Sequence, residues 1–139
     1  MADNAKTPRP VYRNIHVTDI VTYRLPPAGI VSILHRISGA VLFLLMPFII
    51  WMFDTSVSSE ISFDEFTSVF TGEAGWFFKL IALGLIWAYL QHFIAGVRHL
   101  IMDVTHSVSK EQGKSSAIVT LALSLGLTVV LGAKLFGLF

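Results

Sequence analysis

Three long apolar stretches dominate the pattern of hydrophobic and polar positions along the chain. Residues 37–53, 80–97 and 115–133 contain no Asp, Glu, Lys or Arg. Each run is long enough to cross the hydrocarbon core of a bilayer, which is ~30 Å thick, at a helical rise of ~1.5 Å per residue. The pattern therefore predicts an all-α integral membrane protein with three transmembrane helices, over about 28–53, 76–103 and 115–138.

Prolines and aromatic residues add detail to the first predicted helix and the loop after it. Pro26-Pro27 precedes the apolar run, and the helix is expected to begin directly after this pair because proline is tolerated in a first turn. Pro47 lies inside the span and predicts a kink, while Trp51 near the far end is typical of an interfacial anchor. In the following loop, Ser62-Phe63-Asp64-Glu65 predicts a short capped turn.

The composition agrees with one small membrane domain that comprises all 139 residues. A hydrophobic content of 54% and a mean hydropathy of +0.70 are too apolar for a protein with a solvated surface. A net charge of +1 without a basic block gives no indication of nucleic-acid binding. Because the chain has no cysteine, disulfides, thiolate-held iron–sulfur clusters and thiolate-ligated haem are excluded, so any metal chemistry needs histidine or oxygen ligands.

The distribution of charge predicts the orientation in the membrane. Loop 54–75 carries five acidic residues and no Lys or Arg, whereas tail 1–25 and loop 104–114 both carry lysine or arginine. By the positive-inside rule, the tail and the second loop are cytoplasmic, and the first loop and the C-terminus lie outside. The tail resembles neither a signal peptide nor an Arg- and Ser-rich transit peptide, which favours a bacterial inner membrane over the mitochondrial inner membrane.

The second predicted helix carries a stripe of chemically active residues. His92, Gly96, His99 and Asp103 recur at spacings of four, three and four, so they share one face of the helix. His92 lies inside the uncharged run. An ionisable side chain at that depth usually faces a bundle interior, a cofactor or a partner protein.

The predicted orientation places further polar groups on the cytoplasmic side of His92. Arg36 and Arg98 close the cytoplasmic ends of the first two uncharged runs, with His35 and His99 beside them, while His92 lies six residues deeper, or ~9 Å. This layering suits a b-type haem, with a neutral imidazole on the iron. His35, Arg36 and His99 are the candidate partners for its propionates. Gly96, one turn from His92, would let the macrocycle approach the helix backbone.

Each of these residues also has an interpretation that involves no cofactor. His92 could hydrogen-bond to another helix, because intramembrane histidines often pair with one another or with backbone groups. His99 could be the iron ligand, a propionate partner or a solvated interfacial residue. The spacing of residues along the helix does not distinguish these three roles. Arg36 and Arg98 could reach lipid phosphates. Ser32, four residues before Arg36 and on the same face, could bond to its own backbone.

Two segments resemble a known family. Residues 32–39 (SILHRISG) and 92–103 (HFIAGVRHLIMD) together resemble the cytochrome b membrane-anchor subunit of succinate dehydrogenase. The pair Arg9-Pro10 also fits the N-terminal tail of that family. The resemblance spans nearly the whole chain, including the three helices and their order.

The resemblance implies that His92 is one axial ligand of haem b, with the other donated by a second small anchor subunit, so that this chain forms half of a haem-binding bundle. It also implies that Ser32 and Arg36 contribute to a ubiquinone site near the cytoplasmic face. In such complexes a flavoprotein oxidises succinate and an iron–sulfur protein passes the electrons on; this chain has no flavin or cluster motif, and no catalytic residue is expected in it. Arg36 would hold or polarise a quinone carbonyl, and Ser32 would hydrogen-bond to it as negative charge develops.

Two other functions compete with the anchor interpretation. A structural membrane adaptor would use the polar stripe only to dock partner helices. A self-contained cytochrome b would hold the haem between its own histidines, but His35 is expected nearer the surface than His92, and three helices are few to enclose a haem.

Overall fold

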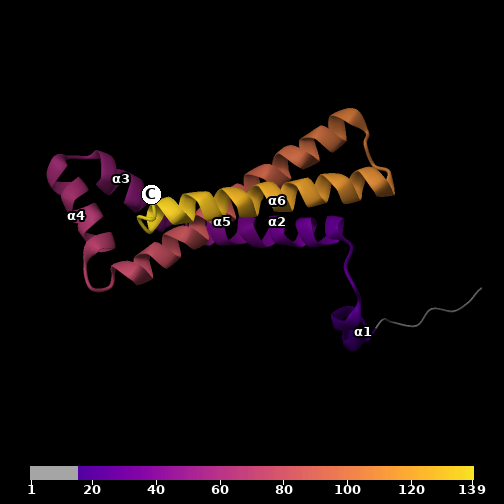
Figure 1. The fold of residues 1–139 in the computed structure, drawn as a ribbon, viewed down its shortest axis with the longest axis horizontal. Coiled ribbons are helices and arrows are strands. Elements are labelled where there is room, and N and C mark those ends of the chain that lie inside the picture. Colours follow the sequence, from indigo (N-terminus) through magenta and orange to yellow (C-terminus); the bar gives the residue numbers. More distant parts are fainter. Residues whose placement is uncertain (1–15) are drawn as a thin grey trace, which may run out of the picture.

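The computed structural model describes residues 16–139, and the regular structure in this part of the chain is entirely helical (Figure 1). The helices are α1 (Val17–Thr22), α2 (Pro27–Leu44), α3 (Met46–Val57), α4 (Glu60–Thr71), α5 (Gly75–Thr105) and α6 (Lys110–Leu135). Helices α2, α5 and α6 are long and apolar enough to cross a membrane, which confirms the predicted fold class. Residues 1–15, including Arg9-Pro10, lie outside the described part of the chain.

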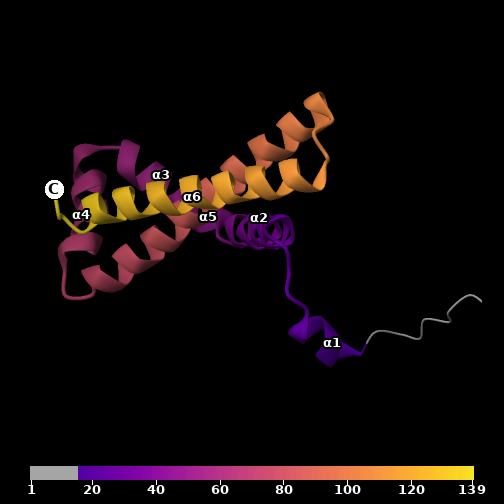
Figure 2. The ribbon, with the colours of Figure 1, turned by 45° about the vertical axis from the view of Figure 1, so that its right-hand side comes forward.

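The three long helices pack side by side, with α5 antiparallel to α2 and α6 (Figures 1 and 2). Small residues line the contacts: Val31 of α2 meets Ala95 of α5 and Ala117 of α6 in the buried core. Gly132 of α6 is buried, and a Cβ atom there would lie 2.8 Å from Leu83 Cδ1. Small side chains let apolar helices approach closely, and this packing is the main source of association between helices in lipid.

The first predicted span is two helices rather than one. α2 ends at Leu44, and Leu45, with φ −93° and ψ 4°, separates it from α3. Pro47 occupies the first turn of α3, where its missing N–H costs nothing, whereas in one continuous helix the carbonyl of Phe43, four residues earlier, would lose its hydrogen-bond donor. The kink predicted at Pro47 is therefore a break two residues earlier.

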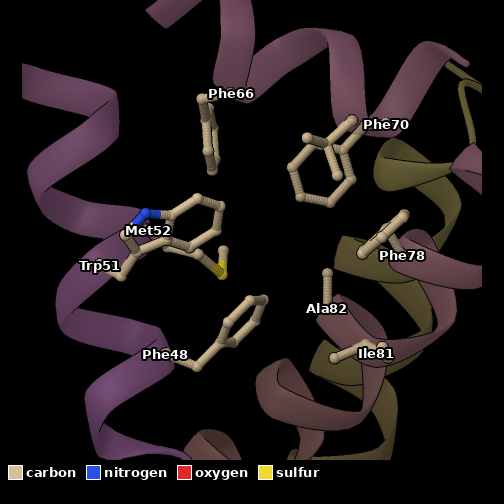
Figure 3. A pocket seen from close by; sticks show the side chains of 9 residues that line it. Phe48, Trp51, Met52, Phe66, Phe70, Phe78, Ile81 and Ala82 are labelled. Atoms are coloured by element: carbon tan, nitrogen blue, oxygen red, sulfur yellow. The ribbon is translucent and has the colours of Figure 1, made fainter. Parts of the chain in front are cut away.

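Helix α4 replaces the short capped turn predicted at 62–65. Ser59 caps it: the Ser59 hydroxyl accepts from the Ser62 N–H at 3.1 Å, and the Ser62 hydroxyl accepts from the Ser59 N–H at 3.0 Å. The helix then turns Phe66 and Phe70 toward α3 and α5, around an apolar pocket of about 160 Å³ (Figure 3). α3 and α4 thus close one end of the bundle.

The other end is the turn between α5 and α6. His106 ends α5 in the left-handed region, with φ 54°. Ser109 caps α6 by accepting from the Gln112 N–H at 3.2 Å, and α6 therefore begins at Lys110, five residues before the predicted position.

Candidate functional site

Three histidines from two helices meet on one side of the bundle. The rings of His35 on α2 and His92 on α5 stack with centroids 4.2 Å apart and an interplanar angle of 10°. His99, two turns along α5, lies with its centroid 5.3 Å from His35. All three side chains are half-buried. The polar stripe of α5 therefore faces α2 and remains open on its outer side.

The backbone of α2 fixes the chemical state of the His92 ring. Nδ1 of His92 lies 3.0 Å from the carbonyl oxygen of His35, which can only accept a hydrogen bond, so Nδ1 is the donor. Ser38, fully buried, donates to the same carbonyl at 3.0 Å. In the neutral ring the proton on Nδ1 leaves a free lone pair on Nε2, which hydrogen-bonds to no group in residues 16–139. A histidine held by a carbonyl through one nitrogen and free at the other is the usual state of a metal-ligating imidazole.

Gly39 provides the space for this ring. A Cβ atom at position 39 would lie 2.8 Å from His92 Cε1 and 3.1 Å from Nδ1, closer than side chains approach. At Gly96 the nearest atom to a Cβ would be His35 Nε2 at 3.7 Å, an ordinary contact. From the sequence, only Gly96 was predicted to make room for a cofactor. Ser38 and Gly39 were given no role, although both fall within segment 32–39.

The axial register of α2 and α5 differs from the one predicted. Aligning Arg36 with Arg98 placed His35 nearer the surface than His92, but Gly39 lies beside His92 and His35 beside Gly96. The shift is three residues, or ~4.5 Å. By this register His35 lies beside a residue four positions, or ~6 Å, nearer the α5–α6 turn than His92, a smaller separation than the alignment of the arginines predicted.

The stacked pair does not resemble the two ligands of one haem. Axial ligands must point their nitrogens at one iron from opposite faces of the macrocycle, whereas His35 and His92 present their flat faces to each other. This geometry gives no support to a self-contained cytochrome b.

Arg98 points away from the histidines. Its side chain is 7% exposed, and it donates to Ser116 Oγ through Nε at 3.0 Å and to the Gly113 carbonyl through Nη2 at 3.3 Å. Six residues along a helix rotate the side chain by about 240° from His92, which directs it to α6. The side chains left on the histidine side that could accompany an anion are His99 and Arg36.

Ser32 and Arg36 lie one turn apart on α2, with Ser32 half-buried and Arg36 exposed. Within residues 16–139 neither side chain forms a hydrogen bond, in contrast with Ser38, whose hydroxyl is used by its own helix. The Ser32 hydroxyl and the Arg36 guanidinium are therefore available to a ligand or partner.

A further polar pair lies in the core beside this site. The Ser124 hydroxyl donates to Gln91 Oε1 at 2.7 Å, and both side chains are fully buried. The other amide atom, Gln91 Nε2, is buried without a partner in the described part of the chain.

Comparison with known proteins identifies the same family that the sequence segments resemble. Residues 7–131 match the family described as succinate dehydrogenase/fumarate reductase transmembrane subunit. The chain is 36% identical to the succinate dehydrogenase cytochrome b556 subunit of Coxiella burnetii, over 82% of this chain and 90% of that protein. It is 33% identical to the b556 subunit of Paracoccus denitrificans, over 94% of both chains. It is 28% identical to the b560 subunit of Reclinomonas americana, over 80% of this chain and 78% of that one.

Proposed function

This chain belongs to the family of cytochrome b membrane-anchor subunits of succinate dehydrogenase, and we propose that it binds haem b and contributes to the site where the complex reduces quinone. The observation that carries the haem proposal is the His92 ring, whose Nδ1 donates to the His35 carbonyl and whose Nε2 is free. The cytochrome b names of the relatives support the same cofactor.

The residues on the histidine side suit the chemistry of a haem. His92 supplies one axial nitrogen, and Gly39 leaves the room its ring needs. His35, Arg36 and His99 are the candidate partners of the propionates, because charged carboxylates at this depth require cationic or N–H donors. When bound, haem b supplies a one-electron carrier within the membrane. A second ligand to the haem iron would come from another small anchor subunit, since the ring of His35 stacks on that of His92.

The quinone proposal depends on Ser32 and Arg36. Both side chains lie on one face of α2 without hydrogen bonds in the described part of the chain. A hydroxyl and a guanidinium aimed at one quinone oxygen stabilise the negative charge that the oxygen gains on reduction. Ubiquinone is the proposed acceptor.

The proposed setting is a bacterial inner membrane, with tail 1–25 and loop 104–114 on the cytoplasmic side. The flavoprotein and iron–sulfur subunits dock on that side, where Arg36 lies near the start of the first span. The remaining surface of the long helices faces lipid or the second anchor subunit.

The haem proposal is tested by reduced-minus-oxidised absorbance of the purified complex. We expect a b-type signal in the wild-type complex and its loss or strong alteration in His92→Ala, while His106→Ala, at an exposed position outside the cluster, leaves it unchanged. An unchanged spectrum and midpoint potential in His92→Ala would reject His92 and make His99 the candidate ligand. A wild-type complex without b-type absorbance would favour the structural adaptor.

A further inference from the structure

Helices α5 and α6 diverge toward the turn that joins them (Figures 1 and 2). A groove of about 480 Å³ lies between them there. Its lining changes character along the helices. Gln112 and Ser116, in the first turns of α6, are polar, whereas Ile94 and Leu123, farther from the turn, are apolar. On the α6 side the groove thus has the polarity of one membrane leaflet, with a polar end at the interface and an apolar wall below it, while α5 lines it with apolar side chains on both sides of Arg98.

Arg98 is the charged residue of this lining. It is 7% exposed, and its partners in residues 16–139 are a hydroxyl and a backbone carbonyl, both neutral. The guanidinium has further N–H donors beyond these two bonds. A buried cation surrounded by apolar side chains is costly unless an anion accompanies it. Among residues 16–139 the charge of Arg98 has no carboxylate partner.

The groove lies on the opposite side of α5 from the histidines. Ile94 is two residues after His92 and Ile101 two residues after His99, and two residues rotate a helix by about 200°. Ile101 and Val119 at the groove are 56% and 53% exposed. A subunit that completes the histidine side would leave this face directed at lipid.

We propose that the groove binds an anionic phospholipid, with its phosphate on the Arg98 guanidinium and one acyl chain along the apolar wall. Charge complementarity selects an anion, and the apolar lower wall selects one that carries a hydrocarbon chain over a soluble phosphate. The site is independent of the proposed haem and quinone sites, because no residue of the groove belongs to either.

The test is lipid retention by the intact complex, measured by native mass spectrometry after exchange of its lipids in detergent. We expect the wild-type complex to retain phosphatidylglycerol in preference to phosphatidylcholine. Arg98→Gln removes the charge, and Val119→Trp fills the apolar part of the groove while Arg98 stays in place. Each is expected to weaken phosphatidylglycerol retention by about tenfold or more. Lys114→Gln, which removes an exposed lysine on the same helix, is the matched control and should retain the lipid.

Three results would overturn the proposal: equal retention of the two lipids by the wild-type complex, displacement of the lipid by sn-glycerol 3-phosphate, or wild-type retention in Val119→Trp. The second result would mean a site for a soluble anion. If Arg98→Gln does not assemble, Val119→Trp decides the outcome, because it leaves the bonds of Arg98 to Ser116 and Gly113 intact.

Discussion

At the scale of single residues, the His92 ring is held by two features of the neighbouring helix. The carbonyl oxygen of His35 accepts from Nδ1, and Gly39 presents no side chain to the ring. The carbonyl also accepts from Ser38, so it is fixed in direction by its own helix. Such a bond orients an imidazole and strengthens its free nitrogen as a ligand, which makes α2 a positioning element for a residue of α5.

Gly39→Ala tests this positioning. The added Cβ would lie 2.8 Å from His92 Cε1, so the ring must move, and its bond to the His35 carbonyl should lengthen or break. Since a ring without that bond is a weaker electron donor, we expect a higher haem midpoint potential and a perturbed b-type spectrum in redox titrations of the complex. Gly84→Ala is the control, because nothing lies within 4 Å of a Cβ at position 84. Identical titrations of the two variants would contradict the assignment.

The buried pair of Gln91 and Ser124 gives a prediction about stability. Ser124→Ala removes the donor to Gln91 Oε1 and leaves a buried acceptor unpaired. We expect it to destabilise the detergent-solubilised protein by roughly 0.5–2 kcal/mol, seen as a lower Tm. Adding Gln91→Leu should recover much of the loss, since both polar groups are then absent. Ser56→Ala is the control, because the Ser56 hydroxyl donates only to the Phe53 carbonyl of its own helix. An equal decrease in Tm in this control would show that the bond between Gln91 and Ser124 does not stabilise the protein more than a bond within one helix.

At the scale of the elements, the sequence predicted the three long helices because each carries an uncharged run. It did not predict where the helices begin and end, because a helix extends beyond its apolar run as far as the nearest capping residue. α6 starts at Lys110 because Ser109 and Gln112 cap each other, and α4 starts at Glu60 because Ser59 does the same with Ser62. The sequence S-K-E-Q at 109–112 is a recognisable capping signature that the prediction from apolar runs did not use, whereas the Ser59–Ser62 pair is not such a signature.

The candidate site was predictable only in part, because helical spacing fixes which residues share a face but not which residues of the next helix lie beside them. Helical spacing put His92 and His99 on one face, and the two rings do lie together with His35. Spacing gives the face of a helix but not its axial position against a neighbour, which is why the predicted separation of His35 and His92 along the helices was too large. The six-residue spacing from His92 also places Arg98 on another face, but its partner Ser116 was not predicted.

The orientation of the helices can be tested with cysteines, because the chain contains none. Ser58→Cys precedes α4 and Lys110→Cys begins α6, and both positions are exposed at opposite ends of the bundle. A membrane-impermeant maleimide applied to spheroplasts should label the first and not the second until the membrane is broken, by the positive-inside rule. Labelling in the reverse order would invert the topology and move the proposed quinone site to the outer side.

At the scale of the whole molecule, the two sides of α5 differ. On one side the histidine cluster is half-buried against α2 and open outward, and on the other the groove at Arg98 opens toward α6. Half-buried imidazoles facing bare lipid would be costly, which supports the proposal that a cofactor and a second subunit cover this side. The proposed function therefore has to be measured in the complete complex.

In that complex, Ser32→Ala and Arg36→Leu separate quinone chemistry from succinate oxidation. Each variant removes a donor that matters most when the quinone oxygen carries negative charge. Losing a hydrogen bond to a charged group costs about 1.5–3 kcal/mol, so quinone reductase turnover should fall roughly ten- to hundredfold. Succinate oxidation with a water-soluble dye should remain near wild type, because the flavin chemistry belongs to another subunit.

The two variants together distinguish a quinone site from a structural role for Arg36. If Arg36 only contacted a lipid phosphate or a haem propionate, Arg36→Leu would reduce both activities or the haem content, and Ser32→Ala would change neither. Ser32 is the sharper probe, since its half-buried hydroxyl forms no bond in residues 16–139 and its removal should not disturb α2. An intact quinone turnover and quinone KM in Ser32→Ala would remove Ser32 from the site, whereas loss of quinone turnover at constant dye activity and constant haem content would place it there.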